Sequence, residues 1–134
     1  MPLSSEARAI PHTQHRENIG ETLGDWSDDV HGTRHYRISD MGNTDYEFMV
    51  LIHEMVEHHL CAKRGITQQQ VDEFDHDFEQ RIEDGEEQKD AEPGDSDKAP
   101  YYNEHQFATI IEKMLCHELG YDWSTYIKES GDTK

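Results

Sequence analysis

The sequence predicts an all-α protein, a compact bundle of three main helices with a loose N-terminal arm and an acidic loop. Three segments carry apolar residues at helical spacing, and each has a capping residue before it or a glycine after it. Only 33% of the 134 residues are hydrophobic, so we expect a modest core within a single domain.

The first 24 residues are polar and show no periodicity, which predicts a disordered N-terminal arm. Residues 25–134 then form a single helical domain. Before the first helix, only a short extended segment around residues 35–39 is expected.

The first helix is predicted over residues 43–64. Thr44 followed by Glu47 has the form of a capping box, and Gly65 is a natural C-terminal stop. The helix is apolar nearly all round, which is typical of a buried helix. Its apolar residues are Phe48, Met49, Val50, Leu51, Ile52, Met55, Val56, Leu60 and Cys61.

The second helix is predicted over residues 67–82, where Thr67 and Gln70 form another capping box. Because the connection at Gly65 is short, we expect the first two helices to be antiparallel neighbours. The apolar residues of the second helix form a narrow stripe: Val71, Phe74, Phe78 and Ile82.

The third helix is predicted over residues 103–119, with Asn103 as its cap and Gly120 at its end. A short closing helix follows from Trp123. The third helix should turn a broad apolar face to the core: Phe107, Ile110, Ile111, Met114, Leu115 and Leu119.

The formal net charge of −18 argues against nucleic acids and anionic membranes as partners. Residues 67–98 hold 13 acidic and three basic residues, a net −10, and residues 83–98 are predicted to be an exposed acidic loop. No segment approaches the roughly 20 apolar residues of a membrane span, and no secretory signal is visible. We therefore expect a cytoplasmic protein in which Cys61 and Cys116 are reduced and buried.

The first helix carries the main candidate site. His53, Glu54 and Glu57 lie side by side on it, since residues three and four apart share a helix face. Val50 and Leu60 fall among them, so this face is not simply a solvated one. Charged groups enclosed by apolar side chains need partners, and a metal ion is a common one.

On the second helix, Asp75 falls inside the apolar stripe and Asp72 borders it. A carboxylate facing the core is costly without a counter-charge. If the two helices are neighbours, both aspartates could face Glu54 and Glu57. The alternative is that each acid pairs with a nearby base or faces water.

The third helix offers weaker candidates. His105 and Glu112 lie seven residues apart on one stripe, and Tyr101 and Lys98 precede the helix. We assign these four to substrate contacts, with Lys98 touching a phosphate and Tyr101 stacking on a base.

His53-Glu54-x-x-Glu57 resembles the helix of zinc peptidases, although Glu57 stands where the usual motif has a second histidine. The resemblance implies that His53 and Glu57 bind zinc and that Glu54 activates water. Asp75 or His76 would then be the third ligand.

Glu54-x-x-Glu57 followed by Asp72-x-x-Asp75 resembles a second family, the all-α nucleotide pyrophosphohydrolases of the MazG type. This resemblance covers the first two helices and implies a homo-oligomer that splits nucleoside triphosphates with magnesium. The chain is also similar to small uncharacterised phage and bacterial proteins, which implies no activity.

Together these residues predict a metal-dependent hydrolase of a nucleotide-like phosphoanhydride, with Glu54 and Glu57 as catalytic residues. The metal ligands would be drawn from His53, Glu54, Glu57, Asp72 and Asp75. A set this rich in carboxylates favours Mg²⁺ or Mn²⁺, while His53 keeps Zn²⁺ open. Two alternatives remain: a zinc-dependent peptidase-like protein, and a non-enzymatic acidic inhibitor or nucleic-acid mimic.

Overall fold

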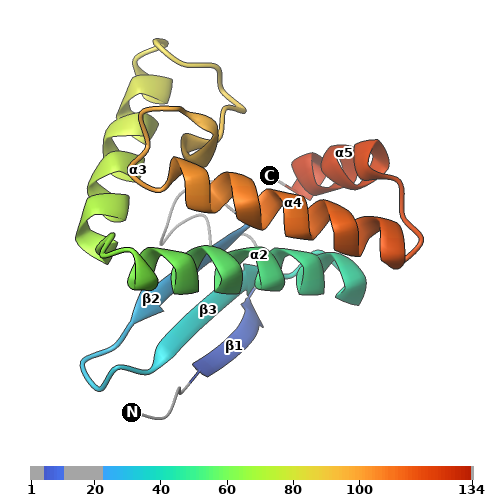
Figure 1. Cartoon of the computed structure of the whole chain (residues 1–134). Coiled ribbons are helices and arrows are strands. Elements are labelled where there is room, and N and C mark those ends of the chain that lie inside the picture. Colours follow the sequence, from blue (N-terminus) through green and yellow to red (C-terminus); the bar gives the residue numbers. More distant parts are fainter. Residues whose placement is uncertain (1–4, 11–22, 134) are drawn as a thin grey trace.

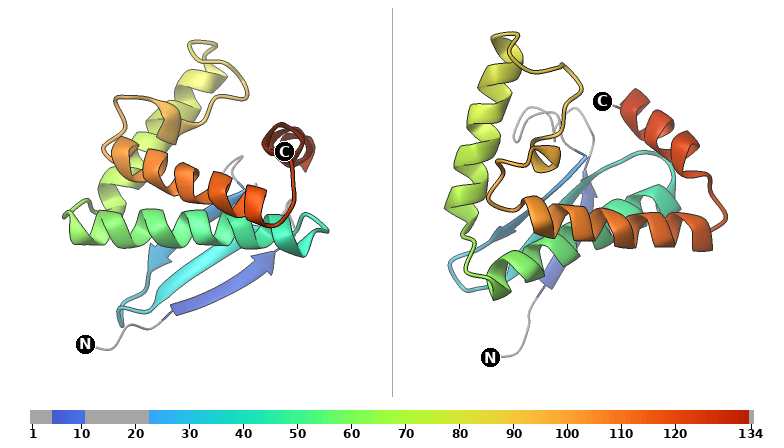
Figure 2. Two further views of the ribbon diagram at one scale, coloured as in Figure 1. Left: turned by 45° about the vertical axis from the view of Figure 1, so that its right-hand side comes forward. Right: turned by 45° about the horizontal axis from the view of Figure 1, so that its top comes forward.

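The computed structural model describes residues 5–10 and 23–133 (Figure 1). The long helix α2 lies on one face of a small sheet, and α4 lies on the far side of α2, as both views of Figure 2 show. In chain order the elements are β1 (Ser5–Ile10), β2 (Gly24–Asp28), β3 (Arg34–Ser39), α2 (Thr44–Lys63), α3 (Gln68–Glu83), η1 (Pro93–Asp95), α4 (Tyr102–Glu118) and α5 (Trp123–Thr133).

The sheet corrects the all-α prediction, although the protein is mainly helical as expected. Its strand order is β1-β3-β2, with β1 parallel and β2 antiparallel to β3. The extended segment predicted around residues 35–39 is confirmed as β3. Trp26 in β2 and Tyr36 in β3 pair across the sheet, and both are buried. These strands are only five and six residues long, so their alternation is too brief to stand out in the sequence.

The predicted disordered arm differs from the structure at Ser5–Ile10, because these residues form β1 and pair with β3 along its whole length. The end of the predicted arm also differs, because Gly24 begins β2. Residues 1–4 and 11–22 lie outside the described residues.

The predicted helices are all present, with small differences at their caps. Asn43, not Thr44, caps α2, since its Oδ1 accepts from the backbone amides of Asp45 and Tyr46 at 3.0 and 3.1 Å. The capping box of α3 at Thr67 and Gln70 is confirmed. Tyr101 precedes α4 without a side-chain cap, so Asn103 does not have its predicted role.

The helices pair differently from the prediction. α2 runs antiparallel to α4, and α3 turns away from both after the Gly65 turn (Figure 1). The acidic residues of α3 therefore do not lie alongside α2, although Asp75 remains close to Glu57. The partner that α2 gains instead is the helix that carries His105 and Glu112.

α4 turns only part of its predicted apolar face to the core, since Leu115 packs against the core while other residues of that face are exposed. Its inner face, against α2 and α5, carries Ala108, Glu112 and Cys116, which are buried. Its outer face carries Phe107, Ile110 and Met114, which are 48%, 53% and 64% exposed. Burial of apolar side chains alone would turn this outer face toward the core. A requirement other than apolar burial must therefore determine which residues of α4 face α2.

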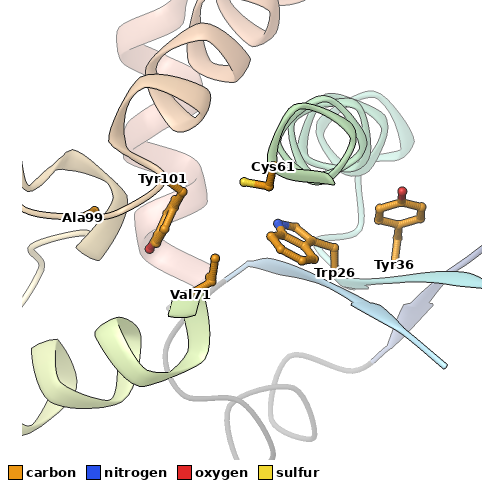
Figure 3. Packing of buried hydrophobic residues seen from close by; sticks show 6 residues of the cluster. All are labelled: Trp26, Tyr36, Cys61, Val71, Ala99 and Tyr101. Atoms are coloured by element: carbon orange, nitrogen blue, oxygen red, sulfur yellow. The ribbon is translucent and has the colours of Figure 1, made fainter. Parts of the chain in front are cut away.

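Two apolar clusters hold the layers together. The first joins β2, β3, α2, α3 and the chain before α4, and Figure 3 shows Trp26 beneath α2, with Val71 and Tyr101 facing it. The second joins α2, α4 and α5 around Met49, Cys116 and Tyr126. Cys61 and Cys116 are free and buried in different clusters, as expected for reduced thiols. In the described part of the chain, no helix has the length and apolar character needed to cross a membrane.

The close approach of β2 to α2 gives a first prediction. A Cβ at Gly24 would lie 2.8 Å from Val50 Cγ1 and 2.9 Å from Glu54 Cγ, so Gly24→Ala must push the strand and helix apart. We expect it to lower the free energy of unfolding by about 1–3 kcal/mol, measured by urea denaturation. Gly131→Ala in α5 is the control, since its Cβ meets nothing within 4 Å. Equal stability of Gly24→Ala and the parent protein would contradict this packing.

Candidate metal centre

Three side chains from α2 and α4 converge at one point. His53 Nε2 lies 3.3 Å from Glu57 Oε2 and 3.2 Å from His105 Nδ1, and His105 Nδ1 lies 2.8 Å from Glu57 Oε2. His53 and Glu57 are one turn apart on α2, and the antiparallel packing of α4 brings His105 against them. All three side chains are largely buried. This group could hold a metal ion.

The second nitrogen of each imidazole faces a carboxylate. His53 Nδ1 lies 2.7 Å from Glu112 Oε1, and His105 Nε2 lies 3.3 Å from Asp95 Oδ1. A carboxylate can only accept, so each of these carboxylates favours a hydrogen on the nitrogen that faces it. In the neutral tautomer with hydrogens on these two nitrogens, His53 Nε2 and His105 Nδ1 keep their lone pairs and direct them at one place. A carboxylate behind a metal-binding histidine is the usual arrangement in proteins.

Glu57 and Glu112 are held in turn. Trp26 Nε1 donates to Glu57 Oε1 at 3.1 Å, which leaves Oε2 directed at the two imidazoles. Tyr126, from α5, donates through its hydroxyl to Glu112 Oε2 at 2.6 Å. β2 and α5 therefore help to orient the site although neither contributes a ligand.

The triangle of ligand atoms suits a small tetrahedral ion. Zinc binds nitrogen and oxygen at about 2.0–2.2 Å, and two ligands of a tetrahedron at that distance lie roughly 3.3 Å apart. Two edges of the triangle are 3.2 and 3.3 Å, and the third is 2.8 Å. Three protein ligands with a fourth position open is the pattern of catalytic zinc sites.

The charges of the site are strongly coupled. Burial disfavours the charged imidazole of His53, but hydrogen bonds to Glu112 and Glu57 outweigh it and raise its pKa well above the usual value. Burial also opposes the charge on His105, yet bonds to Asp95 and Glu57 raise its pKa to about 9. The two imidazoles overcome burial at Glu57 and lower its pKa to about 2. An ion entering the site therefore replaces protons, so metal binding should release them.

Two further carboxyls lie close by. Burial and the charge of Glu57 raise the pKa of Glu54 well above its usual value. Burial raises the pKa of Asp75 to about 7, although the Tyr101 hydroxyl donates a hydrogen bond to it. Neither belongs to the convergent group.

The other predicted site residues lie in different surroundings. Asp72 and Lys98 are exposed, and Asp75 bonds to Tyr101, so the predicted set of four acidic ligands does not gather into a cluster among the described residues. His105, predicted as a substrate contact, is in the ligand group instead. Glu112, also predicted as a substrate contact, lies behind His53, with its Oε1 2.7 Å from His53 Nδ1.

Sequence reasoning missed Trp26, Asp95 and Tyr126. The buried stripe of His105, Ala108, Glu112 and Cys116 is the pattern that could have pointed to an inward-facing polar surface on α4. No comparable pattern marks the three missed residues, because each acts from a different element.

No protein-family model, curated protein or solved structure matches this chain. The metal centre is inferred from the described side chains, in which two imidazole nitrogens and one carboxylate oxygen lie within 4.8 Å of one another.

The ligand triangle predicts one Zn²⁺ bound per chain, with loss of binding in His53→Ala and in His105→Ala. Dialysis followed by elemental mass spectrometry measures the stoichiometry. His76→Ala is the control, since His76 is exposed on α3. Zinc should also raise the melting temperature of the parent protein by mass action. Full occupancy in His105→Ala, or loss of zinc in His76→Ala, would contradict this ligand set.

Proposed function

We propose that the protein is a zinc-dependent hydrolase acting on an amide bond, such as that of a peptide. The observation that carries this proposal is the convergence of His53 Nε2, Glu57 Oε2 and His105 Nδ1, with Glu54 beside them on α2. It favours the peptidase-like alternative of the sequence over the phosphoanhydride hydrolase.

The donor set supports zinc over magnesium. Imidazole nitrogen suits zinc, copper, iron and nickel, whereas magnesium takes oxygen ligands and keeps several waters. The preference for Mg²⁺ or Mn²⁺ depended on carboxylates from both the first and second helices. With Asp72 exposed and Asp75 bonded to Tyr101, two nitrogens and one oxygen are the ligands within reach of one ion.

The charge around the site supports an uncharged scissile group. Besides the imidazoles, the charged groups that act on Glu54 are the carboxyls of Glu57 and Asp25. Those that act on Asp75 are the carboxyls of Glu57 and Asp72. Nearby Arg37 and Arg64 are already paired, with Asp25 and Glu104 respectively. A substrate with several phosphates would be repelled there, whereas an amide would not.

The residues then have distinct roles. A bound zinc ion supplies polarisation of the carbonyl and a lowered pKa for water. Glu54 accepts a proton from the attacking water, whose oxygen joins the carbonyl carbon. As the C–N bond breaks, Glu54 delivers the proton to the leaving amine. Trp26 and Glu112 keep Glu57 and His53 oriented throughout.

A test separates the base from the ligands. Glu54→Gln should keep zinc, because Glu54 is not a ligand, yet lower turnover of fluorescence-quenched peptides by about 10²–10⁴-fold, the usual contribution of a general base. His76→Ala should match the parent protein. Phosphate release from nucleoside triphosphates is measured in parallel.

Other outcomes favour the alternatives. Phosphate release without peptide cleavage, with metal lost in Glu54→Gln, would restore the phosphoanhydride hydrolase. Absence of any bound metal would favour an acidic inhibitor, for which the exposed Asp72, Glu73 and Asp77 of α3 provide a surface.

A further inference from the structure

The short turn η1 lies against the start of α4 and also against α3. In Figure 1 it is part of the orange segment that leads into α4, and the right-hand view of Figure 2 shows it beside the first turn of that helix. The turn is closed by backbone hydrogen bonds from Asp95 N to Glu92 O at 3.1 Å and from Ser96 N to Pro93 O at 3.0 Å. These bonds hold the backbone of the turn in one conformation where it packs against α4.

Gly94 packs directly against the imidazole of His105. A Cβ at position 94 would lie 2.5 Å from both Cγ and Nδ1 of that ring, and Gly94 is buried. Any side chain at this position must displace the ring or the turn. The contact therefore restricts where the ring of His105 can lie.

Asp95 follows directly and faces the other end of the same ring. Its Oδ1 lies 3.3 Å from His105 Nε2 and accepts from Gln106 Nε2 at 3.0 Å. The side chain of Asp95 is 58% exposed, unlike that of Glu112 behind His53. One imidazole is thus supported from the core and the other from a surface turn.

We propose that Gly94 and Asp95 are positioning residues for His105 and that they set the affinity of the metal centre. This inference rests on the proposed zinc site. His105 Nδ1 lies 2.8 Å from Glu57 Oε2, so Glu57 favours a hydrogen on that nitrogen, and such a hydrogen would block metal binding. Asp95 offsets this preference because its carboxylate, 3.3 Å from Nε2, favours a hydrogen on that nitrogen, which leaves the lone pair on Nδ1 for the ion.

Asp95 is a suitable residue to change, because more than half of its side chain is exposed and its removal leaves no cavity in the core. In the full-length protein, Asp95→Ala should weaken zinc binding about 10–100-fold, the usual effect of losing a partner behind a metal-binding histidine. Zinc affinity is measured by competition with a chromophoric chelator. Asp95→Asn retains an acceptor oxygen and should recover part of the affinity.

Asp97→Ala is the matched control, since Asp97 is an exposed acid of the same loop. It removes the same charge and should leave the affinity unchanged. Urea denaturation of the metal-free proteins should show that Asp95→Ala and Asp97→Ala both remain folded, with Asp95→Ala the less stable because it loses its contacts with His105 and Gln106. The visible absorption of bound Co²⁺ should change only when His105 is displaced, as in Asp95→Ala and Gly94→Ala.

The outcomes are distinguishable from failure of the zinc site itself. If the parent protein binds no zinc, the proposed function fails. If the parent binds zinc and Asp95→Ala binds it equally well with the same Co²⁺ spectrum, the positioning role is overturned while the site stands. An equal loss in Asp95→Ala and Asp97→Ala would also overturn it, because the effect would then be one of general charge.

Discussion

The buried carboxylate of Glu57 is the constraint on which the rest of the arrangement depends. A charge removed from water is expensive unless hydrogen bonds and opposite charges surround it. Glu57 receives Trp26 from β2, His53 from its own helix and His105 from α4. Meeting the needs of this one group therefore ties the sheet, α2 and α4 together. It also leaves one oxygen and two nitrogens directed at a common point.

The orientation of α4 follows from the same requirement. Turning Phe107, Ile110 and Met114 inward would bury more apolar surface, but it would carry His105 and Glu112 away from α2. The fold gives up that hydrophobic gain and keeps the polar residues inside. Proteins commonly give up some stability at functional sites in this way. The orientation of α4 therefore keeps His105 and Glu112 in contact with α2 at the expense of apolar burial.

The sequence predicted the helices well because each spans several turns of consistent apolar spacing. It also identified His53 and Glu57, since polar residues within an apolar helix are visible on a helical wheel. It misplaced His105, because a wheel shows which face a residue occupies but not which helix that face meets. The pairing of α2 with α4 rather than α3 is a tertiary fact, which depends on contacts between residues distant in the chain, such as His53 with Glu112 and Glu57 with His105.

The acidic loop shows where composition misleads. Residues 83–98 are rich in charge, and composition alone describes them as an exposed connection. Yet the end of this loop is anchored, since Gly94 within it and Ala99 and Tyr101 directly after it are all buried. Tyr101 donates to Asp75 of α3, and Gly94 packs against His105, so contacts hold this end of the segment on two sides. A short buried turn inside a charged segment leaves almost no trace in composition, although it packs against a candidate metal ligand.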